Sequence, residues 1–174
     1  MILEIPQVLD ADGCAELVTL LDRHGGEESR VEQVYAGAVD EAVAHEVKRR
    51  RDLVLEGEIE QLLANRLART LFPAIYKAAA YKCTRFEGFK VALYPEGGLF
   101  RAHRDDVSPA TAHRRWSLTL ALNDGYEGGA LAFPEKDKAL SPPRGGAVVF
   151  RSHLLHEVLP VTKGVRYALI SFLW

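Results

Sequence analysis

The chain has 174 residues, which is enough to bury a hydrophobic core and fits one compact domain spanning residues 1–174. A formal net charge of −2 provides no global positive field, so we expect no nucleic-acid partner and no attraction to an anionic membrane. No apolar run reaches membrane-spanning length, and the first residues lack the basic and apolar regions of a signal peptide.

The first half of the chain, residues 1–83, is predicted to be a mainly helical support. Asp10 or Asp12 can cap a first helix that ends at Gly25-Gly26. The apolar stripe of this helix consists of Cys14, Leu17, Val18 and Leu21. The charged segment 27–56 is expected to be a loop, with a short strand at Val31–Tyr35. Its basic run, residues 48–51, is interpreted as a solvated surface.

A second helix is predicted from about Glu58 to Tyr81, with a kink or a break at Pro73. Its apolar stripe consists of Ile59, Leu62, Leu63, Leu67, Leu71, Ile75 and Ala78. The two cysteines, Cys14 and Cys83, show neither a CxxC pair nor regular spacing. We therefore expect no disulfide scaffold and a cytoplasmic protein.

From residue 84 onward, short β-like runs alternate with Gly, Pro and Asn-Asp turn signals. Leu118, Leu120 and Leu122 alternate with smaller residues, which predicts a strand with one polar-tolerant face. The predicted strands are Phe89–Tyr94, Leu99–His103, Trp116–Leu122, Ala130–Phe133, Ala147–Phe150, His156–Val161 and Arg166–Trp174. Helices followed by many short strands indicate an α+β fold, with helices bracing a sandwich or barrel formed by residues 84–174.

The triplet His103-Arg104-Asp105 is the most informative motif. Residues i and i+2 of a strand point to the same face, so the imidazole and the carboxylate project together while Arg104 points away. A second histidine would complete the two-histidine, one-carboxylate set of non-haem Fe(II) oxygenases. The three remaining metal positions can accept a bidentate 2-oxo acid and dioxygen.

Two histidines, His153 and His156, compete for the third ligand position. Spacing does not decide between them, because Lys163 and Arg166 each lie ten residues further on. Lys163 falls in a predicted turn, whereas Arg166 opens an apolar strand where an unpaired charge is costly. This context favours His156, with Arg166 gripping a ligand carboxylate. An ion pair between Arg166 and Glu157 is the alternative.

Further residues are candidates for the same pocket. Tyr94 ends a strand and could reach the cosubstrate, although a core tyrosine is an equal alternative, and Thr119 lies on the polar-tolerant strand face. Three other residues near the motif, Asp106, His113 and His153, have side chains that can bind metals, but we do not expect them to be ligands. The arginines near the predicted mouth, Arg114 and Arg115, are interpreted as solvated, with contact to an acidic substrate as the alternative.

Residues 89–174 resemble the prolyl-hydroxylase-like branch of the 2-oxoglutarate/Fe(II) dioxygenases. The matching segments run in the same order and spacing as in that family. They are Tyr94-Pro-Glu-Gly-Gly98 through His103-Arg-Asp105, Leu118 to Asn123, Tyr126-Glu-Gly-Gly129, Pro143-Arg-Gly-Gly146 through Phe150, His156 to Val161, and Gly164-Val-Arg166-Tyr167. The DNA-repair branch carries a second arginine where this chain has Phe172, which argues against nucleobase repair.

The resemblance implies a double-stranded β-helix, or jelly roll. It implies His103, Asp105 and His156 as iron ligands, Arg166 as the cosubstrate clamp, and Tyr94 near the cosubstrate. The implied activity is hydroxylation of a peptidyl proline, an amino acid or another small molecule, with Fe(II), 2-oxoglutarate and dioxygen. A cupin-like metalloprotein and a non-catalytic sensor on the same fold are the alternatives, and the sequence leaves the oligomeric state open.

Overall fold

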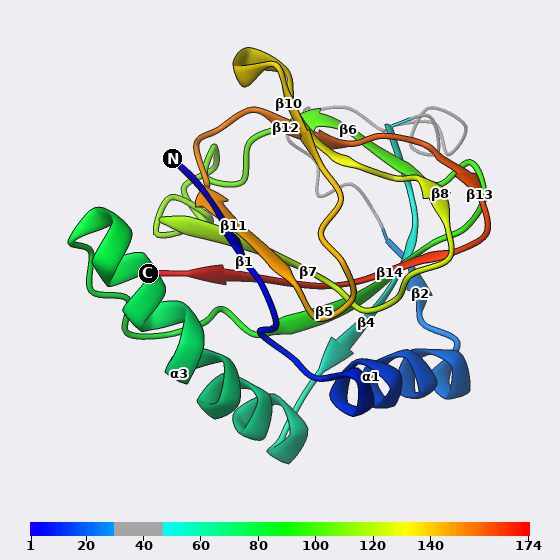
Figure 1. The fold of residues 1–174 in the computed structure, drawn as a ribbon, viewed down its shortest axis with the longest axis horizontal. Helices are drawn as coiled ribbons and strands as arrows, with labels where there is room; N and C mark the ends of the chain where they lie inside the picture. Colours follow the sequence, from blue (N-terminus) through cyan, green and yellow to red (C-terminus); the bar gives the residue numbers. More distant parts are fainter. Residues whose placement is uncertain (30–46) are drawn as a thin grey trace.

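The computed structural model describes residues 1–29 and 47–174, in which two antiparallel sheets face each other (Figure 1). The major sheet has the order β1 (Ile2–Ile5), β11 (Ala147–Arg151), β7 (Trp116–Ala121), β14 (Arg166–Leu173), β5 (Phe89–Tyr94), β4 (Arg51–Leu55) and β2 (Glu27–Glu28). The minor sheet has the order β10 (Lys138–Leu140), β9 (Leu131–Phe133), β12 (His156–Val158), β6 (Leu99–His103) and β3 (Lys48–Arg49). The strands β8 (Glu127–Gly128) and β13 (Val161–Lys163) pair separately, and a 3-10 turn, η1 (Pro134–Lys136), joins β9 to β10.

Two helices cover the outer face of the major sheet (Figure 1). Helix α1 (Ala11–His24) begins after Asp10, whose carboxylate accepts a hydrogen bond from the Gly13 amide, so Asp10 and not Asp12 is the cap. It ends at Gly25, which has a positive φ of 76°. The α+β prediction, a double-stranded β-helix braced by N-terminal helices, is therefore confirmed.

Helix α3 (Glu58–Ala79) runs without a break through Pro73. Of the two predicted effects of this proline, the break is therefore wrong, and the kink stays a prediction. The buried stripe of the helix is narrower than predicted and consists of Leu63, Leu67, Leu71 and Ile75. Leu62 is 63% exposed because it lies on the side of the helix opposite this stripe. Ala78, in the last turn of the helix, is also exposed.

The expectation that residues 27–56 form a loop is wrong for the residues that the structure describes. Strand β4 pairs with β5 along its whole length, and the short β3 pairs with β6 in the other sheet. The basic run is therefore part of the sheets, and its Arg50 is buried. The predicted strand Val31–Tyr35 lies outside the described residues.

The predicted strands of the second half are confirmed with small changes at their ends. The segment predicted as His156–Val161 divides into β12 and β13, with Pro160 between them. Lys163 belongs to β13 instead of a turn, although it is solvated as expected. Strands β1, β8 and β10 have no counterpart among the sequence predictions.

Apolar side chains form two separate cores. One lies between the helices and the major sheet and includes Cys14, Leu67 and Trp116. The other lies between the two sheets and includes Tyr94 and Phe150. The alternation in β7 serves both cores, because its leucines face the helices while its polar residues face the barrel interior.

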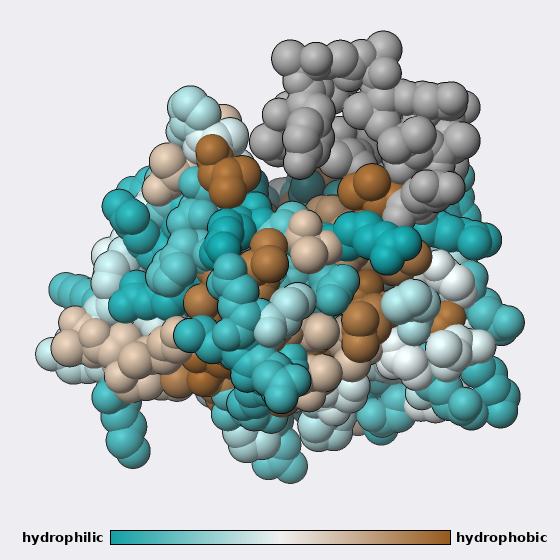
Figure 2. Space-filling model, turned by 90° about the horizontal axis from the view of Figure 1, so that it is seen from above, coloured by the Kyte–Doolittle hydropathy of each residue, from teal (hydrophilic) through white to brown (hydrophobic). Residues whose placement is uncertain are grey.

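The outer surface adds two observations. The face shown in Figure 2 carries apolar residues scattered among hydrophilic ones. None of the helices in the described part of the chain is long and apolar enough to cross a membrane.

Replacing Leu67 by alanine tests the observed stripe of α3. Leu67 is fully buried, so Leu67→Ala should lower the free energy of unfolding by about 2–5 kcal/mol. Leu62→Ala is the matched control on the same helix and should change it by no more than about 0.5 kcal/mol. Urea denaturation of both variants measures the difference, and equal losses would show that the helix packs in another rotation.

Candidate active site

A cavity opens inside the barrel, between the major and minor sheets. Its wall includes residues of both sheets: Arg50, Tyr94, Phe100, His103, Asp105, Ser117, Leu118, Thr119, Leu131, Phe150, His156, Val158, Ile170 and Phe172. Five of the six predicted site residues are in this wall, and the sixth, Arg166, packs against Tyr94. The fold therefore brings the predicted residues together.

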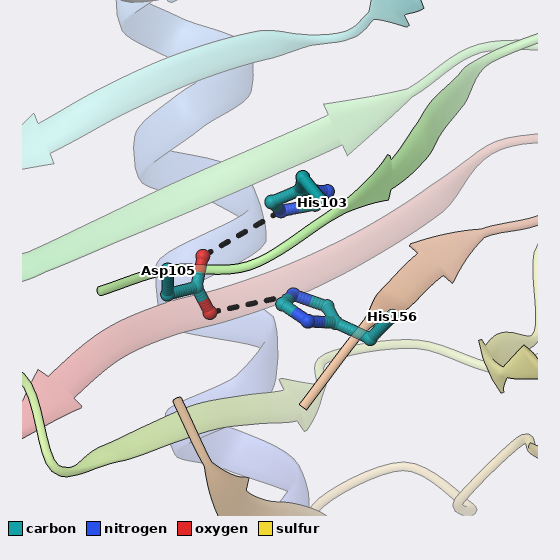
Figure 3. A group of neighbouring side chains, drawn as sticks. All are labelled: His103, Asp105 and His156. Carbon is teal, nitrogen blue, oxygen red and sulfur yellow. Dashed lines mark ion pairs between the residues drawn. The ribbon is translucent and has the colours of Figure 1, made fainter. Parts of the chain in front are cut away.

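Three of the cavity residues, His103, Asp105 and His156, form a compact group (Figure 3). Strands β6 and β12 are antiparallel, and their register places His156 directly opposite His103. Asp105 follows β6 and turns its carboxylate between the two imidazoles (Figure 3). One ligand atom from each residue lies within 4.8 Å of the others, as binding to a single metal ion requires.

Both imidazoles are held through their Nδ1 atoms. His103 Nδ1 lies 2.7 Å from the carbonyl oxygen of Arg101, and His156 Nδ1 lies 2.9 Å from that of Leu154. These carbonyls require a proton on Nδ1, which leaves Nε2 as the free lone pair. The Nε2 atoms face Asp105, at 3.5 Å for His103 and 3.3 Å for His156.

The Asp105 carboxylate has its own support. Ser117 donates a hydrogen bond of 2.6 Å to Asp105 Oδ2, and the Ser117 hydroxyl lies 3.0 Å from that of Ser152. Burial alone would raise the pKa of Asp105, but the two histidines and Ser117 lower it to about 2. Burial lowers the pKa of His156. At neutral pH the site therefore offers an ionised carboxylate and a neutral imidazole, the forms that bind metals.

This set of two histidines and one carboxylate has the composition that suits Fe(II) in non-haem oxygenases and leaves metal positions open for other ligands. The other candidates lie elsewhere. His153 is exposed, and His113 is 2.9 Å from Glu87. Asp106 is outside the group.

Arg166 is a buried cation without a counter-ion among the described residues. Its side chain is 4% exposed, and its Nη1 atom has no hydrogen-bond partner in the described chain, so the predicted alternative of a pair with Glu157 is not observed. Its guanidinium lies 4.8 Å from the centre of the Tyr94 ring. Gly129 leaves room for it, because a Cβ there would lie 2.9 Å from Arg166 Cδ. A buried guanidinium with an unused donor fits a ligand carboxylate.

Arginines near the mouth do not all behave as predicted. Arg114 is neither solvated nor free for a substrate, because it pairs with Glu87, donates to the carbonyl of Asp105 and lies 3.8 Å from the Phe172 ring centre. Arg115 is exposed, as expected. Arg104 points away from the cavity and pairs with Glu135 at 2.6 Å.

Among the polar residues of the cavity wall, Ser117 and Arg50 were not predicted. Ser117 lies two residues before Thr119 on the polar-tolerant face of β7, so the same alternation could have identified it. Arg50 offered no comparable signal, because it is surrounded by other basic residues in the sequence.

The fold and this site together define a mononuclear non-haem iron type of oxygenase, and comparison with known proteins agrees. The sequence profile of the 2OG-Fe(II) oxygenase superfamily matches residues 89–174. A PKHD-type hydroxylase of Pseudomonas putida strain F1 is 30% identical over 184 residues, covering 100% of this chain and 77% of the relative. A PKHD-type hydroxylase of Parvibaculum lavamentivorans is 31% identical with the same coverage.

Solved structures share the fold. A viral collagen prolyl hydroxylase from Paramecium Bursaria Chlorella virus-1, solved with 2OG, superposes with a TM-score of 0.74 at 17% identity and covers 99% of this chain and 94% of its own. A Pseudomonas putida prolyl-4-hydroxylase gives 0.72 at 22% identity, with coverages of 99% and 91%. A Trichoplax adhaerens prolyl hydroxylase with a hypoxia inducible factor peptide gives 0.73 at 20% identity, with coverages of 99% and 83%.

The chain belongs to the 2OG-Fe(II) oxygenase superfamily, and the relatives that match it over its whole length are PKHD-type hydroxylases. It is a non-haem iron dioxygenase that uses Fe(II), 2-oxoglutarate and dioxygen.

Removing the Ser117 hydroxyl tests whether its hydrogen bond positions Asp105 for metal binding. Ser117→Ala should weaken binding of Mn(II) or Co(II) by about ten- to a hundred-fold, because Asp105 loses an orienting donor. Ser171→Ala is the control, since Ser171 is also buried but donates to the carbonyl of Gly88. Anaerobic calorimetric titration measures both, and an unchanged affinity in Ser117→Ala would show that Asp105 is held without it.

Proposed function

We propose that His103, Asp105 and His156 hold Fe(II), and that Arg166, with Tyr94 and Thr119, binds 2-oxoglutarate. The observation that carries the proposal is the unpaired guanidinium of Arg166 in the same barrel as the His-Asp-His group. A cupin-like metalloprotein without 2-oxoglutarate would leave that buried charge without a purpose. A non-catalytic module would have no need of a complete ligand set.

When bound, the iron and its cosubstrate would supply oxidation by dioxygen, in which one oxygen atom enters succinate as 2-oxoglutarate loses carbon dioxide and the other converts a substrate C–H bond to C–OH. The protein contributes position and exclusion of water. Ser117 and the carbonyls of Arg101 and Leu154 orient the three ligands. Arg166 fixes the far end of the cosubstrate, so that its 2-oxo acid end faces the ligands.

The substrate we propose is a prolyl or amino-acid type group, either in a peptide or as a small molecule. This substrate class is supported by the relatives, which are named as hydroxylases, and by the structural neighbours, which are prolyl hydroxylases, one of them bound to a peptide. The cavity wall agrees, because much of it is apolar and aromatic. These side chains suit a compact, largely non-polar ring.

We further propose that the chain acts as one catalytic unit in the cytoplasm, without a nucleic-acid or membrane partner. Strands β3 and β4 from the first half complete the two sheets of the second half, which supports a single unit. Both cysteines are free and buried, which fits a reducing compartment.

Loss of the carboxylate ligand tests the catalytic assignment. Purified protein with Fe(II), ascorbate and 2-oxoglutarate should release succinate, and prolyl peptides, amino acids and small metabolites can be screened for stimulation. Asp105→Ala should reduce release to that of a protein-free reaction, because one metal ligand is removed. Asp106→Ala, at the neighbouring acid outside the group, should retain it. Full turnover by Asp105→Ala would refute the assignment.

Truncation of Arg166 tests the cosubstrate site separately. Arg166→Ala should raise the KM for 2-oxoglutarate about ten- to a hundred-fold, as expected for loss of a charge-assisted contact. The affinity for Mn(II) should stay within about three-fold of the wild-type value, because the lost hydrogen bond is one to the cosubstrate and Arg166 is not a metal ligand. Lys163→Ala is the control. Lys163 lies ten residues after His153, the alternative metal ligand that the structure places outside the group, and its side chain is 73% exposed. An effect of Lys163→Ala as large as that of Arg166→Ala would count against the clamp.

A further inference from the structure

Arg50 occupies an unusual place, at the point where the chain passes from one sheet to the other. The residues before it, β3, pair with β6 of the minor sheet, and the residues after it, β4, pair with β5 of the major sheet. Its side chain is therefore directed between the sheets, where it is 9% exposed and lines the cavity of the iron ligands. The guanidinium lies 5.5 Å from the Phe100 ring centre and 5.6 Å from that of Tyr94.

The charge of Arg50 is already compensated by protein groups. Its Nε lies 2.9 Å from Asp52 Oδ1, and its Nη2 donates to Asp52 Oδ2 at 2.9 Å, which is a two-point contact. Ser29 also donates to Asp52 Oδ2, at 2.7 Å, and so fixes the carboxylate. Burial favours the neutral form, yet Tyr94 and Asp52 raise the pKa of Arg50, and it stays charged.

Arg50 and Arg166 thus differ although both lie near the Tyr94 ring. Arg166 keeps a buried donor that no described residue satisfies, as expected for a residue that binds a ligand directly. Arg50 donates from Nη2 to Asp52 and from Nη1 to the hydroxyl oxygen of Tyr94, at 2.8 Å. Its Nε makes an ion-pair contact with Asp52 without a hydrogen bond, so the charge of Arg50, unlike that of Arg166, lies against a protein carboxylate. Arg50 lines the cavity, and Tyr94 is the cavity residue to which it donates a hydrogen bond.

The hydrogen bond from Arg50 determines what the Tyr94 hydroxyl can do. A phenol has one proton to donate, and its oxygen here is already the acceptor of a cationic donor. No acceptor for the Tyr94 proton is found among residues 1–29 and 47–174, while the residue lines the cavity. An anionic oxygen in the cavity would satisfy it, and the adjacent positive charge strengthens the phenol as a donor.

We propose that Arg50 is a positioning residue for the cosubstrate, which makes Tyr94 a fixed hydrogen-bond donor to an oxygen of 2-oxoglutarate. The proposal rests on the proposed function, because it takes 2-oxoglutarate as the ligand of this cavity. Asp52 belongs to the same unit, since it holds the guanidinium in place and offsets its charge.

A double-mutant cycle on the Mn(II)-loaded protein tests this role, with the Kd for 2-oxoglutarate measured by anaerobic calorimetry. Arg50→Gln should weaken binding about ten-fold, the loss expected for one hydrogen bond to a charged group. In a Tyr94→Phe background, Arg50→Gln should weaken 2-oxoglutarate binding by less than about two-fold, because the hydrogen bond from the Tyr94 hydroxyl that Arg50 supports is already absent. Turnover should show a raised KM for 2-oxoglutarate at little-changed kcat.

Two further variants guard against a purely structural effect. Arg50→Lys keeps a charge for Asp52 without the two-point contact, and it should lose about three-fold in affinity while folding as the wild type does. Arg51→Gln is the matched control, because Arg51 is exposed and donates to the carbonyl of Gly26. It should bind 2-oxoglutarate as the wild type does.

The possible results distinguish the role of Arg50 from the binding of 2-oxoglutarate itself. Equal losses from Arg50→Gln in both backgrounds would mean that Arg50 touches the ligand itself, and would overturn the inference alone. Unchanged affinity in the folded Arg50→Lys and Arg50→Gln proteins would overturn it as well. Absence of 2-oxoglutarate binding by the wild type would overturn the proposed function and this inference together.

Discussion

The antiparallel pairing of β6 with β12 is the constraint on which the site depends. It sets His103 opposite His156 and thereby fixes the distance between two side chains that are 53 residues apart in the sequence. A shift of one residue would turn one imidazole to the outer face of the sheet. Asp105 then needs only to follow β6 to reach both rings, and the backbone carbonyls beside the histidines keep the Nε2 atoms turned toward it.

The second consequence of the fold is the separation of its two cores. The core under the helices is apolar and stabilises the major sheet. The interior of the barrel combines apolar residues with buried polar groups, including the charged Arg50 and Arg166. A buried charge between the sheets is unfavourable unless it is paired, and the two arginines differ in their partners. Arg50 is paired by Asp52, whereas Arg166 has a donor that remains for a ligand.

Much of this arrangement could be predicted from local sequence. The alternation in residues 116–122 predicted the strand and its polar face. The His-x-Asp motif predicted that His103 and Asp105 share one site, although Asp105 lies beyond the end of β6 and not on the strand. The burial of Arg50 could not be predicted, because it arises from the pairing of β3 and β4 with strands of different sheets, which is non-local. The exposure of Leu62 likewise depends on how α3 is rotated against the sheet.

We propose that one cavity holds Fe(II) and 2-oxoglutarate together, with the cosubstrate bound to the metal. Visible absorption of the anaerobic Fe(II) protein tests it most directly, because chelation of Fe(II) by a 2-oxo acid gives a weak metal-to-ligand charge-transfer band. We expect this band to appear when 2-oxoglutarate is added to the wild type, and we expect succinate not to produce it. A protein that binds Fe(II) and shows no band at saturating 2-oxoglutarate would contradict the account.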